Sequence, residues 1–445
     1  MEQEFIVEIE ELSNLGAGIA KHEGKVIFVE NTCPGDRVKI KITKQNKTYS
    51  FGQLVEIINP SKHRVKPFCP MQKVCGACQI QFIDYKEQLK IKQQIVKDYS
   101  RNLNLEVGET VPSPEIKGYR HKIQYPVSET KNSKRIIAGY YKPKSHEIVN
   151  IKYCPIQPEI CDEIIDYIRE NAPKYNISGY REKSHSGILK HIVIRSSAET
   201  GNNLLVMVIN DNKISKQIKQ FGEDIYNRFD KISGVCVNFN NKKTNLILSD
   251  KTQTLCGEGY IEEKLCGITF KIGANTFFQV NPKSAENIFQ YVKQYIKENF
   301  ESPTILDAYA GIAVFGIVMS NISQKVVSVE ENQESISLAK EVLELNKIHN
   351  VDLYAMDTAK YLETTEQKFD VTILDPPRKG CTQESLDGVL KVTKSKIIYV
   401  SCNPQTLARD LEYLIFKGGK VNFIQPFDMF CHTYHVESVA VIDLE

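Results

Sequence analysis

Three residues in the last quarter of the chain have side chains that could perform covalent chemistry together. Cys402 and Asp375 each follow a strand-like apolar run, and Glu437 enters one. A thiolate is a strong nucleophile, and a carboxyl group in apolar surroundings has a raised pKa, which suits a general base. Asp375 begins an Asp-Pro-Pro turn, whose fixed φ makes a stiff rim that can aim the carboxylate at a planar ring. Alone, Cys402 would fit a packing role and Glu437 a polar strand start beside His435, but their combination favours chemistry.

These residues must be positioned by strands and helices that alternate from Pro282 to the end of the chain. Such alternation predicts a mostly parallel, doubly wound α/β sheet. In this fold ligands bind at the carboxyl ends of the strands. Asp307, Glu330, Asp375 and Cys402 end four predicted strands, so we expect them to converge.

A nucleotide-type cofactor is expected beside them. Residues 310–316 form a degenerate glycine loop between a strand and a helix, with Ala313 where a second glycine is usual. Glu330 could accept hydrogen bonds from ribose hydroxyls, although a solvated strand end would look the same. NAD and S-adenosylmethionine both fit these features.

A helix start upstream of the sheet adds an amide to the site. Asn281 is expected to cap this helix and Pro282 to begin it. The amide of Gln279, just before the cap, could therefore reach a cofactor. Without a functional role for this segment, its neighbours Phe277 and Phe278 would simply pack in the core.

A second cluster of reactive side chains lies near the N-terminus. Cys69, Cys75 and Cys78 could wrap one metal centre, with Cys154 as a candidate fourth ligand and Cys161 as its rival. Three clustered thiols plus a remote one suit an iron–sulfur cluster, whereas zinc more often takes paired ligands. Spacing alone leaves zinc and unliganded thiols open.

Composition limits what the whole chain can do. Its 445 residues are 41% hydrophobic and 25% charged, which excludes disorder and a coiled coil. Lys and Arg number 57 against 55 Asp and Glu, so nucleic-acid binding would need local basic patches. No run approaches the ~18 apolar residues that span a bilayer, and no secretory signal is visible. We therefore expect a cytoplasmic protein without a membrane partner, a monomer, and cysteines that serve metals or catalysis.

Three parts of the chain can be distinguished. Residues 1–58 contain short β-rich runs between glycine turns, which predict a small β-barrel. Residues 59–275 mix helices and strands around the cysteine cluster and predict an α+β domain. Residues 276–445 carry the Rossmann-like α/β pattern. Basic runs at 37–47, 62–66 and 120–122 could hold a nucleic-acid backbone, although solvated strand faces would look similar.

Together these residues resemble the RNA uracil-5-methyltransferase family. The resemblance covers the whole chain and is carried by Phe277-Phe-Gln-Val-Asn281, Asp307-Ala-Tyr-Ala-Gly311, Asp375-Pro-Pro-Arg378, Ser401-Cys-Asn-Pro404 and His435-Val-Glu437. The barrel is similar to the TRAM domain, an OB-like RNA-binding module. The four cysteines at 69, 75, 78 and 154 resemble the ligands of a [4Fe-4S] cluster in the ribosomal RNA branch. Because the bacterial tRNA branch lacks both additions, the resemblance implies 23S rRNA as the substrate.

The resemblance also implies roles for individual residues. Cys402 would add to carbon 6 of uracil, carbon 5 would take the methyl group of S-adenosylmethionine, and Glu437 would remove the carbon 5 proton. A target base within folded RNA would first be flipped out of its stack. The residues implied to contact S-adenosylmethionine or the base are Gln279, Tyr309, Glu330, Asp357 and Asp375.

Several alternatives remain at this point. A nicotinamide-dependent oxidoreductase would use the same sheet but gives Cys402 no task. A methyltransferase acting on exocyclic amines can use Asp-Pro-Pro but needs no nucleophilic cysteine. A tRNA uridine-5 methyltransferase and a non-catalytic iron–sulfur RNA-binding protein are the other candidates.

Overall fold

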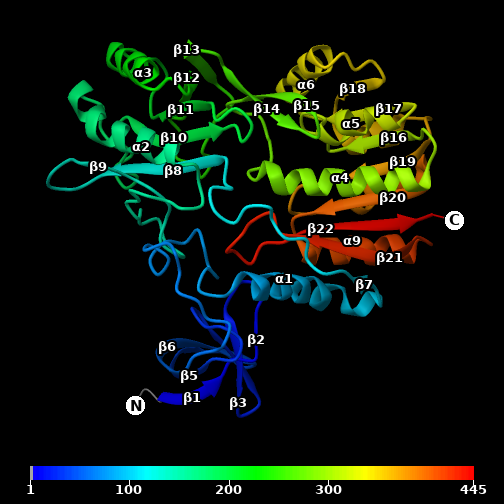
Figure 1. The fold of residues 1–445 in the computed structure, drawn as a ribbon, viewed down its shortest axis with the longest axis horizontal. Coiled ribbons are helices and arrows are strands. Elements are labelled where there is room, and N and C mark those ends of the chain that lie inside the picture. Colours follow the sequence, from blue (N-terminus) through cyan, green and yellow to red (C-terminus); the bar gives the residue numbers. More distant parts are fainter. Residues whose placement is uncertain (1–3, 445) are drawn as a thin grey trace.

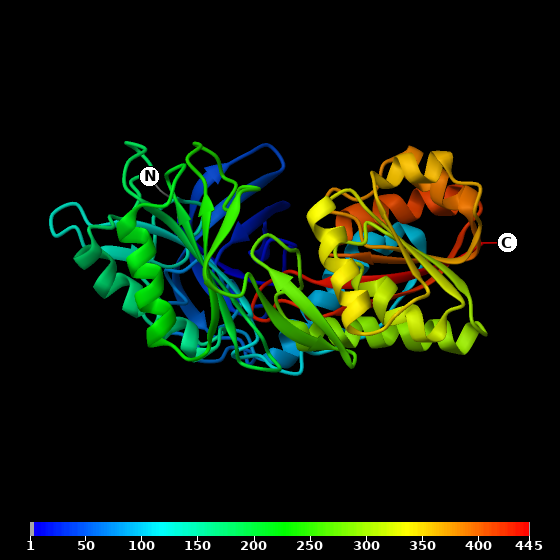
Figure 2. The same cartoon turned by 90° about the horizontal axis from the view of Figure 1, so that it is seen from above.

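Four β-sheets organise the chain in a computed structural model that describes residues 4–444. Residues 1–3 and 445, which belong to the predicted first and last parts, lie outside this range. The N-terminal sheet lies below the others in Figure 1, next to helix α1. Seen from above, a lobe with the central sheet and a lobe with the C-terminal sheet stand side by side (Figure 2). No helix among the described residues is long and apolar enough to cross a membrane.

The N-terminal sheet forms the predicted small barrel. Its six strands follow the order β1-β5-β6-β4-β3-β2, and Glu10 N donates to Ile19 O at 2.9 Å where the chain after β1 meets β3. Alternating residues of the strands fill its interior, so Val38 and Ile40 are buried, while Arg37 is exposed and Lys39 is half-buried. The strands are β1 (Glu4–Glu8), β2 (Glu11–Leu12), β3 (Gly18–His22), β4 (Lys25–Val29), β5 (Arg37–Gln45) and β6 (Tyr49–Asn59).

The central sheet is mixed and is covered by two amphipathic helices (Figure 1). Its order is β13-β12-β11-β10-β8-β9, and every residue of the central strand β11 is buried. Ser215 caps α3, as its type predicts. The elements are β8 (Lys122–Glu129), β9 (Ile136–Ala138), α2 (Glu159–Asn171), β10 (Leu189–Ser196), β11 (Asn203–Ile209), α3 (Lys216–Arg228), β12 (Ile232–Phe239) and β13 (Thr252–Gly257). A hairpin of β14 (Tyr260–Leu265) and β15 (Ile268–Gly273) lies between the two lobes (Figure 2).

The C-terminal sheet has eight strands in the order β18-β17-β16-β19-β20-β22-β21-β7. Strands β18, β17, β16, β19 and β20 run parallel, and β22 is antiparallel to both of its neighbours. Its strands are β16 (Thr304–Ala308), β17 (Lys325–Glu330), β18 (Val351–Ala355), β19 (Phe369–Leu374), β20 (Thr393–Ser401), β21 (Lys420–Phe427) and β22 (Glu437–Asp443). Its helices are α4 (Pro282–Asn299), α5 (Val314–Met319), α6 (Gln333–Leu345), α7 (Thr358–Thr364), α8 (Gln383–Val392) and α9 (Pro404–Phe416). The strand order reverses direction between β16 and β19, which is where a doubly wound sheet opens a ligand crevice.

One segment from before the central sheet packs against the C-terminal sheet. Helix α1 (Tyr85–Ser100) is capped by Asp84, and β7 (Glu106–Val107) pairs with β21 as the last strand of the C-terminal sheet. Lys92 of α1 and Asp428 are both fully buried and form an ion pair at 2.5 Å. The predicted domain boundaries at residues 58 and 275 stay a prediction. The segment from α1 to β7 belongs to the predicted part 59–275 but packs against the predicted part 276–445.

Candidate active site

One cavity of about 730 Å³ opens at the switch point of the C-terminal sheet. It lies at the carboxyl ends of β16, β17, β19 and β20, where the sequence predicts ligand binding. All of the predicted catalytic and cofactor residues line it: Gln279, Tyr309, Glu330, Asp357, Asp375, Cys402 and Glu437. The structure therefore brings together residues that are up to 158 positions apart, since Gln279 and Glu437 share its wall.

The glycine loop and the end of β17 form one wall of this cavity. Gly311 N donates to one carboxylate oxygen of Glu330, and Asn332 N donates to the other, both at 2.9 Å. Tyr309, Gly311 and Ala313 all have positive φ angles. The missing glycine at position 313 is thus replaced by a buried alanine that adopts the left-handed conformation itself, at a cost of about 1 kcal/mol or more.

Asp357 lies on the same wall, at the start of a helix. It is the N-cap of α7 and accepts a hydrogen bond from Lys360 N at 3.0 Å. Asp357 is exposed and lines the cavity. A short polar side chain at an N-cap is locally stabilising, and the same position makes Asp357 part of the cavity lining.

Asp307 lies near the other strand-end residues, since its charge affects the pKa of Asp375 and the charge of Glu330 affects its own, but it does not join the cavity. It is 1% exposed and does not line the cavity. One of its oxygens accepts hydrogen bonds from Gly316 N at 2.9 Å and from the Ser328 hydroxyl at 3.0 Å. Asp307 therefore stabilises the turn into α5 from behind the cavity wall. Its position at a strand end could not distinguish this structural role from a ligand-binding role.

Cys402 lies among charged groups on the opposite wall. Burial and the neighbouring Glu437 raise the pKa of its thiol to about 11, and the Arg378 guanidinium, which hydrogen-bonds the thiol, acts in the opposite direction. Asn403 caps α9 and its amide donates to Arg378 O at 3.0 Å. The helix that follows the cysteine thus also fixes the backbone of the arginine beside it.

The two carboxyl groups near Cys402 both have raised pKa values. Glu437 begins β22 and is 6% exposed, and burial together with Asp375 raises its pKa to about 8. Burial and the charge of Asp307 raise the pKa of Asp375 to about 7. Arg378 and Lys92 favour the ionised form of Glu437. The cavity thus holds one thiol and two carboxyl groups whose pKa values lie near or above neutrality, the pattern expected of acid–base chemistry.

The segment before Glu437 is held in place by the buried pair that involves α1. Asp428 accepts hydrogen bonds from Lys92 Nζ at 2.5 Å and from the Tyr85 hydroxyl at 2.8 Å. Lys92 also donates to Phe430 O at 2.9 Å, and Phe430 lines the cavity. Helix α1 therefore positions one wall of the site, although it precedes Glu437 by more than 300 residues.

The segment before α4 places Gln279 as predicted, but one of its neighbours differs. Asn281 caps α4, accepting from Ser284 N at 3.2 Å, and Pro282 begins it. Phe278 is 6% exposed and packs in the core, whereas Phe277 is 62% exposed at the cavity, so simple core packing describes only one of the two rings. Phe277 and Arg378 are among the cavity residues to which sequence reasoning gave no role. The only signal was their place inside the motifs 277–281 and 375–378.

The cysteine cluster is assembled only in part. Cys69, Cys75, Cys78 and Cys154 are free thiols whose pKa values are all raised, mainly by burial. The pKa of Cys78 is also raised by the charges of the other three, whereas Cys161 is not among the groups that affect it. Yet within residues 4–444 no group of three or more His, Cys, Asp or Glu side chains is gathered so that it could hold a metal ion. Four thiols whose ionised forms would repel one another fit a metal centre by donor chemistry, but the predicted iron–sulfur cluster is not confirmed.

Comparison with known proteins identifies the class to which this fold and cavity belong. Residues 84–444 match the model of the family described as tRNA (uracil-5-)-methyltransferase, and residues 2–55 match the TRAM domain. A protein from Halalkalibacterium halodurans named as an uncharacterized RNA methyltransferase is 36% identical, with 99% of this chain and 96% of that protein covered. An uncharacterized RNA methyltransferase from Clostridium tetani is 37% identical, with coverages of 96% and 93%.

A solved structure covers nearly the whole fold. It is the Pyrococcus abyssi tRNA (uracil-54, C5)-methyltransferase in complex with S-adenosyl-L-homocysteine, which is 26% identical, with a TM-score of 0.79, 98% of this chain and 100% of that chain covered. The chain therefore belongs to the tRNA (uracil-5-)-methyltransferase family. It is an S-adenosylmethionine-dependent RNA methyltransferase with an N-terminal TRAM domain.

Proposed function

We propose that this protein methylates carbon 5 of a specific uridine in RNA through a covalent bond between Cys402 and carbon 6 of the base. The observation that carries this proposal is the shared cavity, which is lined by Cys402, Asp375 and Glu437 together with Gln279, Glu330 and Asp357. A nucleophile, a base and a cofactor wall in one crevice meet the needs of covalent methyl transfer.

The reaction uses the charged groups of the cavity in order. Arg378 favours the thiolate of Cys402, which adds to carbon 6 and pushes the electrons of the double bond onto carbon 5 and the adjoining carbonyl. Carbon 5 then takes the methyl group of the sulfonium donor. Glu437 removes the remaining proton from carbon 5, the double bond reforms, and Cys402 leaves as a thiolate.

Asp375 and Phe277 hold the reactants in this proposal. Asp375 lies in the stiff turn before Pro376 and Pro377, and its pKa of about 7 allows it to accept or donate a hydrogen bond at the ring edge. The exposed ring of Phe277 offers a stacking face for a flipped base. When bound, S-adenosylmethionine supplies the electrophilic methyl group, and Gln279, Tyr309, Glu330 and Asp357 would hold it.

The Glu437→Gln variant tests the order of steps. Cys402 can still add and the methyl group can still arrive, but the carbon 5 proton has no base. We expect an RNA–protein adduct that survives denaturing electrophoresis, carries label from a labelled methyl donor, and is absent from the Cys402→Ala/Glu437→Gln double variant. Normal turnover, or inactivity without adduct at any time, would place the base elsewhere.

We propose 23S rRNA as the substrate, because the TRAM domain and the four-cysteine set resemble the ribosomal RNA branch. A second candidate is tRNA, which is favoured by the similarity to the Pyrococcus abyssi tRNA (uracil-54, C5)-methyltransferase over its full length. Mass mapping of 5-methyluridine in 23S rRNA and tRNA, from cells with and without the protein, decides between them. Loss of the modification from tRNA alone would reject the ribosomal substrate.

We further propose that Cys69, Cys75, Cys78 and Cys154 hold a [4Fe-4S] cluster that supports folding and RNA positioning in the cytoplasm. The charges of Cys69, Cys75 and Cys154 all affect the pKa of Cys78, whereas Cys161 interacts with Cys154 alone among the four, and this supports the ligand set over one with Cys161. Anaerobically purified protein should contain about four irons per chain. Stoichiometric zinc without iron would identify the other metal, and bleaching by Cys161→Ala but not by Cys154→Ala would reject the fourth ligand.

A further inference from the structure

The segment that leads into Glu437 contains a strained turn. His432 has a φ angle of 65°, in the left-handed region that residues with a β-carbon rarely adopt. It lies five positions before Glu437 and is 2% exposed. Such a conformation persists only where the surrounding structure determines it. The contacts of His432 therefore identify what holds the turn in place.

Helix α1 holds His432 through one buried amide. Gln88 is 1% exposed, and its Oε1 accepts a hydrogen bond from His432 N at 3.1 Å. Its Nε2 donates to Ile83 O at 2.8 Å and lies 3.3 Å from His432 Nδ1. Gln88 therefore contacts both the backbone and the ring of the strained residue, and the bond to Ile83 O fixes the orientation of its amide.

Three further hydrogen bonds hold this turn. His432 Nε2 donates to Ile116 O at 2.8 Å, which leaves Nδ1 to act as an acceptor. Ile80 N donates to His432 O at 3.0 Å. The Tyr119 hydroxyl donates to Cys431 O, the carbonyl just before His432, at 2.9 Å. All of these partners precede the turn by more than 300 positions, so the first half of the chain fixes a turn near its end.

The turn is connected to the catalytic cavity on its other side. Phe430 lines the cavity, and its carbonyl accepts a hydrogen bond from Thr433 Oγ1 at 2.8 Å. Thr433 Oγ1 in turn accepts from His435 N at 3.2 Å. Val436, between His435 and Glu437, is 1% exposed. A displacement of the turn would therefore move the start of β22, where Glu437 lies.

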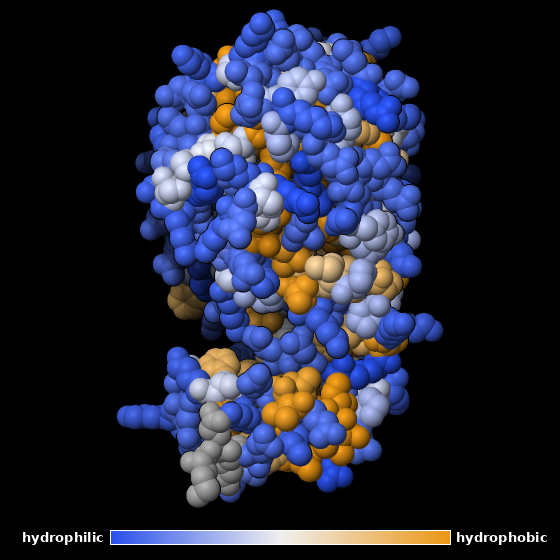
Figure 3. Space-filling model, turned by 90° about the vertical axis from the view of Figure 1, so that its left-hand side faces the viewer, coloured by the Kyte–Doolittle hydropathy of each residue, from blue (hydrophilic) through white to orange (hydrophobic). Residues whose placement is uncertain are grey.

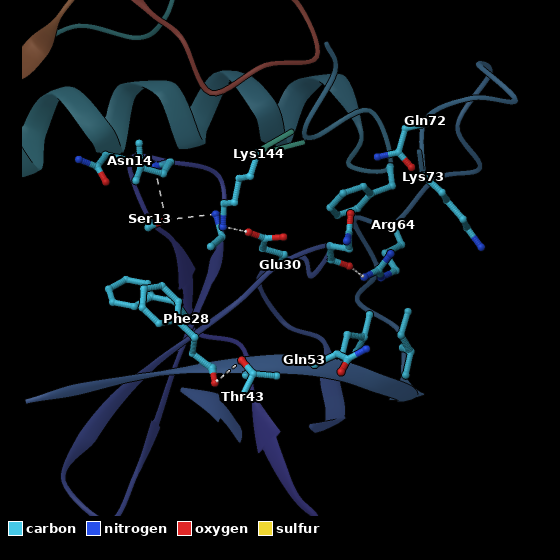
Figure 4. A pocket seen from close by; sticks show the side chains of 18 of the residues that line it. Ser13, Asn14, Phe28, Glu30, Thr43, Gln53, Arg64, Gln72, Lys73 and Lys144 are labelled. Atoms are coloured by element: carbon cyan, nitrogen blue, oxygen red, sulfur yellow. Dashed lines mark hydrogen bonds and ion pairs between the residues drawn. The ribbon is translucent and has the colours of Figure 1, made fainter. Parts of the chain in front are cut away.

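The barrel reaches the same segment through residues 13–17. Figure 3 shows the barrel below a mainly hydrophilic body, with apolar side chains gathered on its surface. Gly16 has a φ angle of 75°, and a β-carbon there would lie 3.0 Å from Cδ1 of Tyr434. Figure 4 shows Asn14 next to helix α1, where its side-chain amide donates to the Tyr99 hydroxyl. Glycine at position 16 thus allows the barrel to approach the turn closely.

The residues 13–17 also border a second cavity, of about 1330 Å³, which we call the barrel cavity. Its other walls are strands β4, β5 and β6, residues between 64 and 82, and Lys144 from the central domain. Lys144 reaches toward Glu30 in Figure 4. Among residues 4–444 this lining shares none with the catalytic cavity, so the two cavities can be changed separately.

We propose that Gln88 and Tyr119 are positioning residues for methyl transfer. They hold the strained turn at His432, and the turn places Glu437 where it can remove the carbon 5 proton. Neither Gln88 nor Tyr119 lines the catalytic cavity, so both act through the turn. A displacement of about 1 Å in a catalytic group can slow its step about a hundredfold. This inference rests on the proposed function in taking Glu437 as the base.

The ratio of covalent adduct to released product tests this role. Full-length protein is incubated with labelled S-adenosylmethionine and total RNA from cells that lack the protein, and labelled adduct and methylated RNA are separated by denaturing electrophoresis. We expect Gln88→Met, which keeps the length of the side chain but loses its hydrogen bonds, to raise the ratio about tenfold, because only proton removal is slowed. Unfolding lowers adduct and product together and leaves the ratio unchanged.

Tyr119→Phe is a milder second variant, because it removes one hydroxyl group, and it should raise the ratio severalfold. Two matched controls lose similar hydrogen bonds elsewhere. Gln93→Met loses the bond from Gln93 Nε2 to Val107 O at 3.0 Å on the same helix. Tyr167→Phe loses the bond from the Tyr167 hydroxyl to Asp224 at 2.6 Å, between α2 and α3. Both controls should keep the wild-type ratio.

A wild-type ratio in Gln88→Met and Tyr119→Phe, or an equal rise in the controls, would overturn the proposal. If Gln88→Met does not fold, Tyr119→Phe decides alone. Glu437→Gln assayed in parallel separates this inference from the proposed function. Adduct in Glu437→Gln together with a wild-type ratio in the two positioning variants rejects only the positioning role, whereas no adduct in Glu437→Gln rejects the assigned base itself.

Discussion

The two cavities of this protein are lined by side chains of different kinds and different burial. The catalytic cavity places a thiol and carboxyl groups at strand ends, where Glu437 is 6% exposed and its pKa is raised to about 8. The barrel cavity presents the sides of strands, where Phe51 and Lys44 remain in contact with solvent. Chemistry needs groups whose protonation is controlled by burial, whereas an RNA-binding module such as the TRAM domain needs exposed rings and charges.

This difference predicts two separable phenotypes. Changes in the catalytic cavity should lower kcat, depend on pH and be insensitive to salt. Changes in the barrel cavity should raise KM, depend on salt and leave the pH profile unaltered. The following experiments could break that separation, beginning with the largest expected effect.

Cys402→Ala should reduce the rate of methyl transfer by more than a thousandfold, because the nucleophile itself is lost. Loss of a proton-transfer group alone typically lowers a rate by ~10²–10⁴-fold. Binding of S-adenosylmethionine, measured by calorimetry, should be nearly unchanged, since the thiol lies on the opposite wall from Glu330 and Asp357. Turnover above about one-thousandth of the wild-type rate would reject the nucleophile assignment.

Lys92→Met should destabilise the protein by about 3–5 kcal/mol, because it leaves Asp428 buried without its partner. Urea unfolding followed by circular dichroism measures this loss. The matched control is Lys144→Ala, which breaks an ion pair whose side chains are 77% and 57% exposed and should not change stability measurably. Comparable losses in the two variants would contradict the distinction between the buried and the exposed pair.

The sequence predicted the catalytic cavity well, for a physical reason. Asp375, Cys402 and Glu437 each border an apolar run, and the topology of a parallel sheet brings such positions to one edge. The cap at Asn281 was equally visible, and Asp84 and Ser215 cap their helices with residue types that favour this position.

What the sequence could not predict depends on side-chain direction and long-range packing. Asp307 ends a strand like Asp375, but the turn into α5 takes its hydrogen bonds, and no local pattern reveals that. Phe277 and Phe278 look alike in sequence, yet only one is buried. The contact of Lys92 with Asp428 joins residues 336 positions apart, and the barrel cavity depends on how Lys144 and the barrel meet.

The pH dependence of methyl transfer should report the ionisation of Glu437 in the catalytic cavity. Glu437 must be ionised to act as the base, and its pKa of about 8 means that it is mostly protonated at pH 7. The ionisation of Glu437 alone should therefore raise the rate of methyl transfer about tenfold between pH 7 and 9. The thiol, whose pKa is about 11, multiplies this rise by up to about a hundredfold when thiolate formation limits the rate. Adduct formation by Glu437→Gln should lack the inflection near pH 8. A flat profile between pH 6 and 9 would contradict the assigned base.

The smallest effect should come from the cations of the barrel cavity. Each phosphate contact on a single strand contributes a slope of roughly −0.7 to the dependence of log affinity on log salt. Lys44→Ala/Lys73→Ala, which removes two lysines from the lining of the barrel cavity, should therefore make the slope for binding of an oligouridylate shallower by about 1.4 and weaken binding mainly at low salt. The control is Lys47→Ala/Lys62→Ala, which removes the same charge from exposed lysines outside the cavity and should change the slope less. If both pairs change it equally, diffuse charge attracts the RNA, and the barrel cavity does not hold its phosphates.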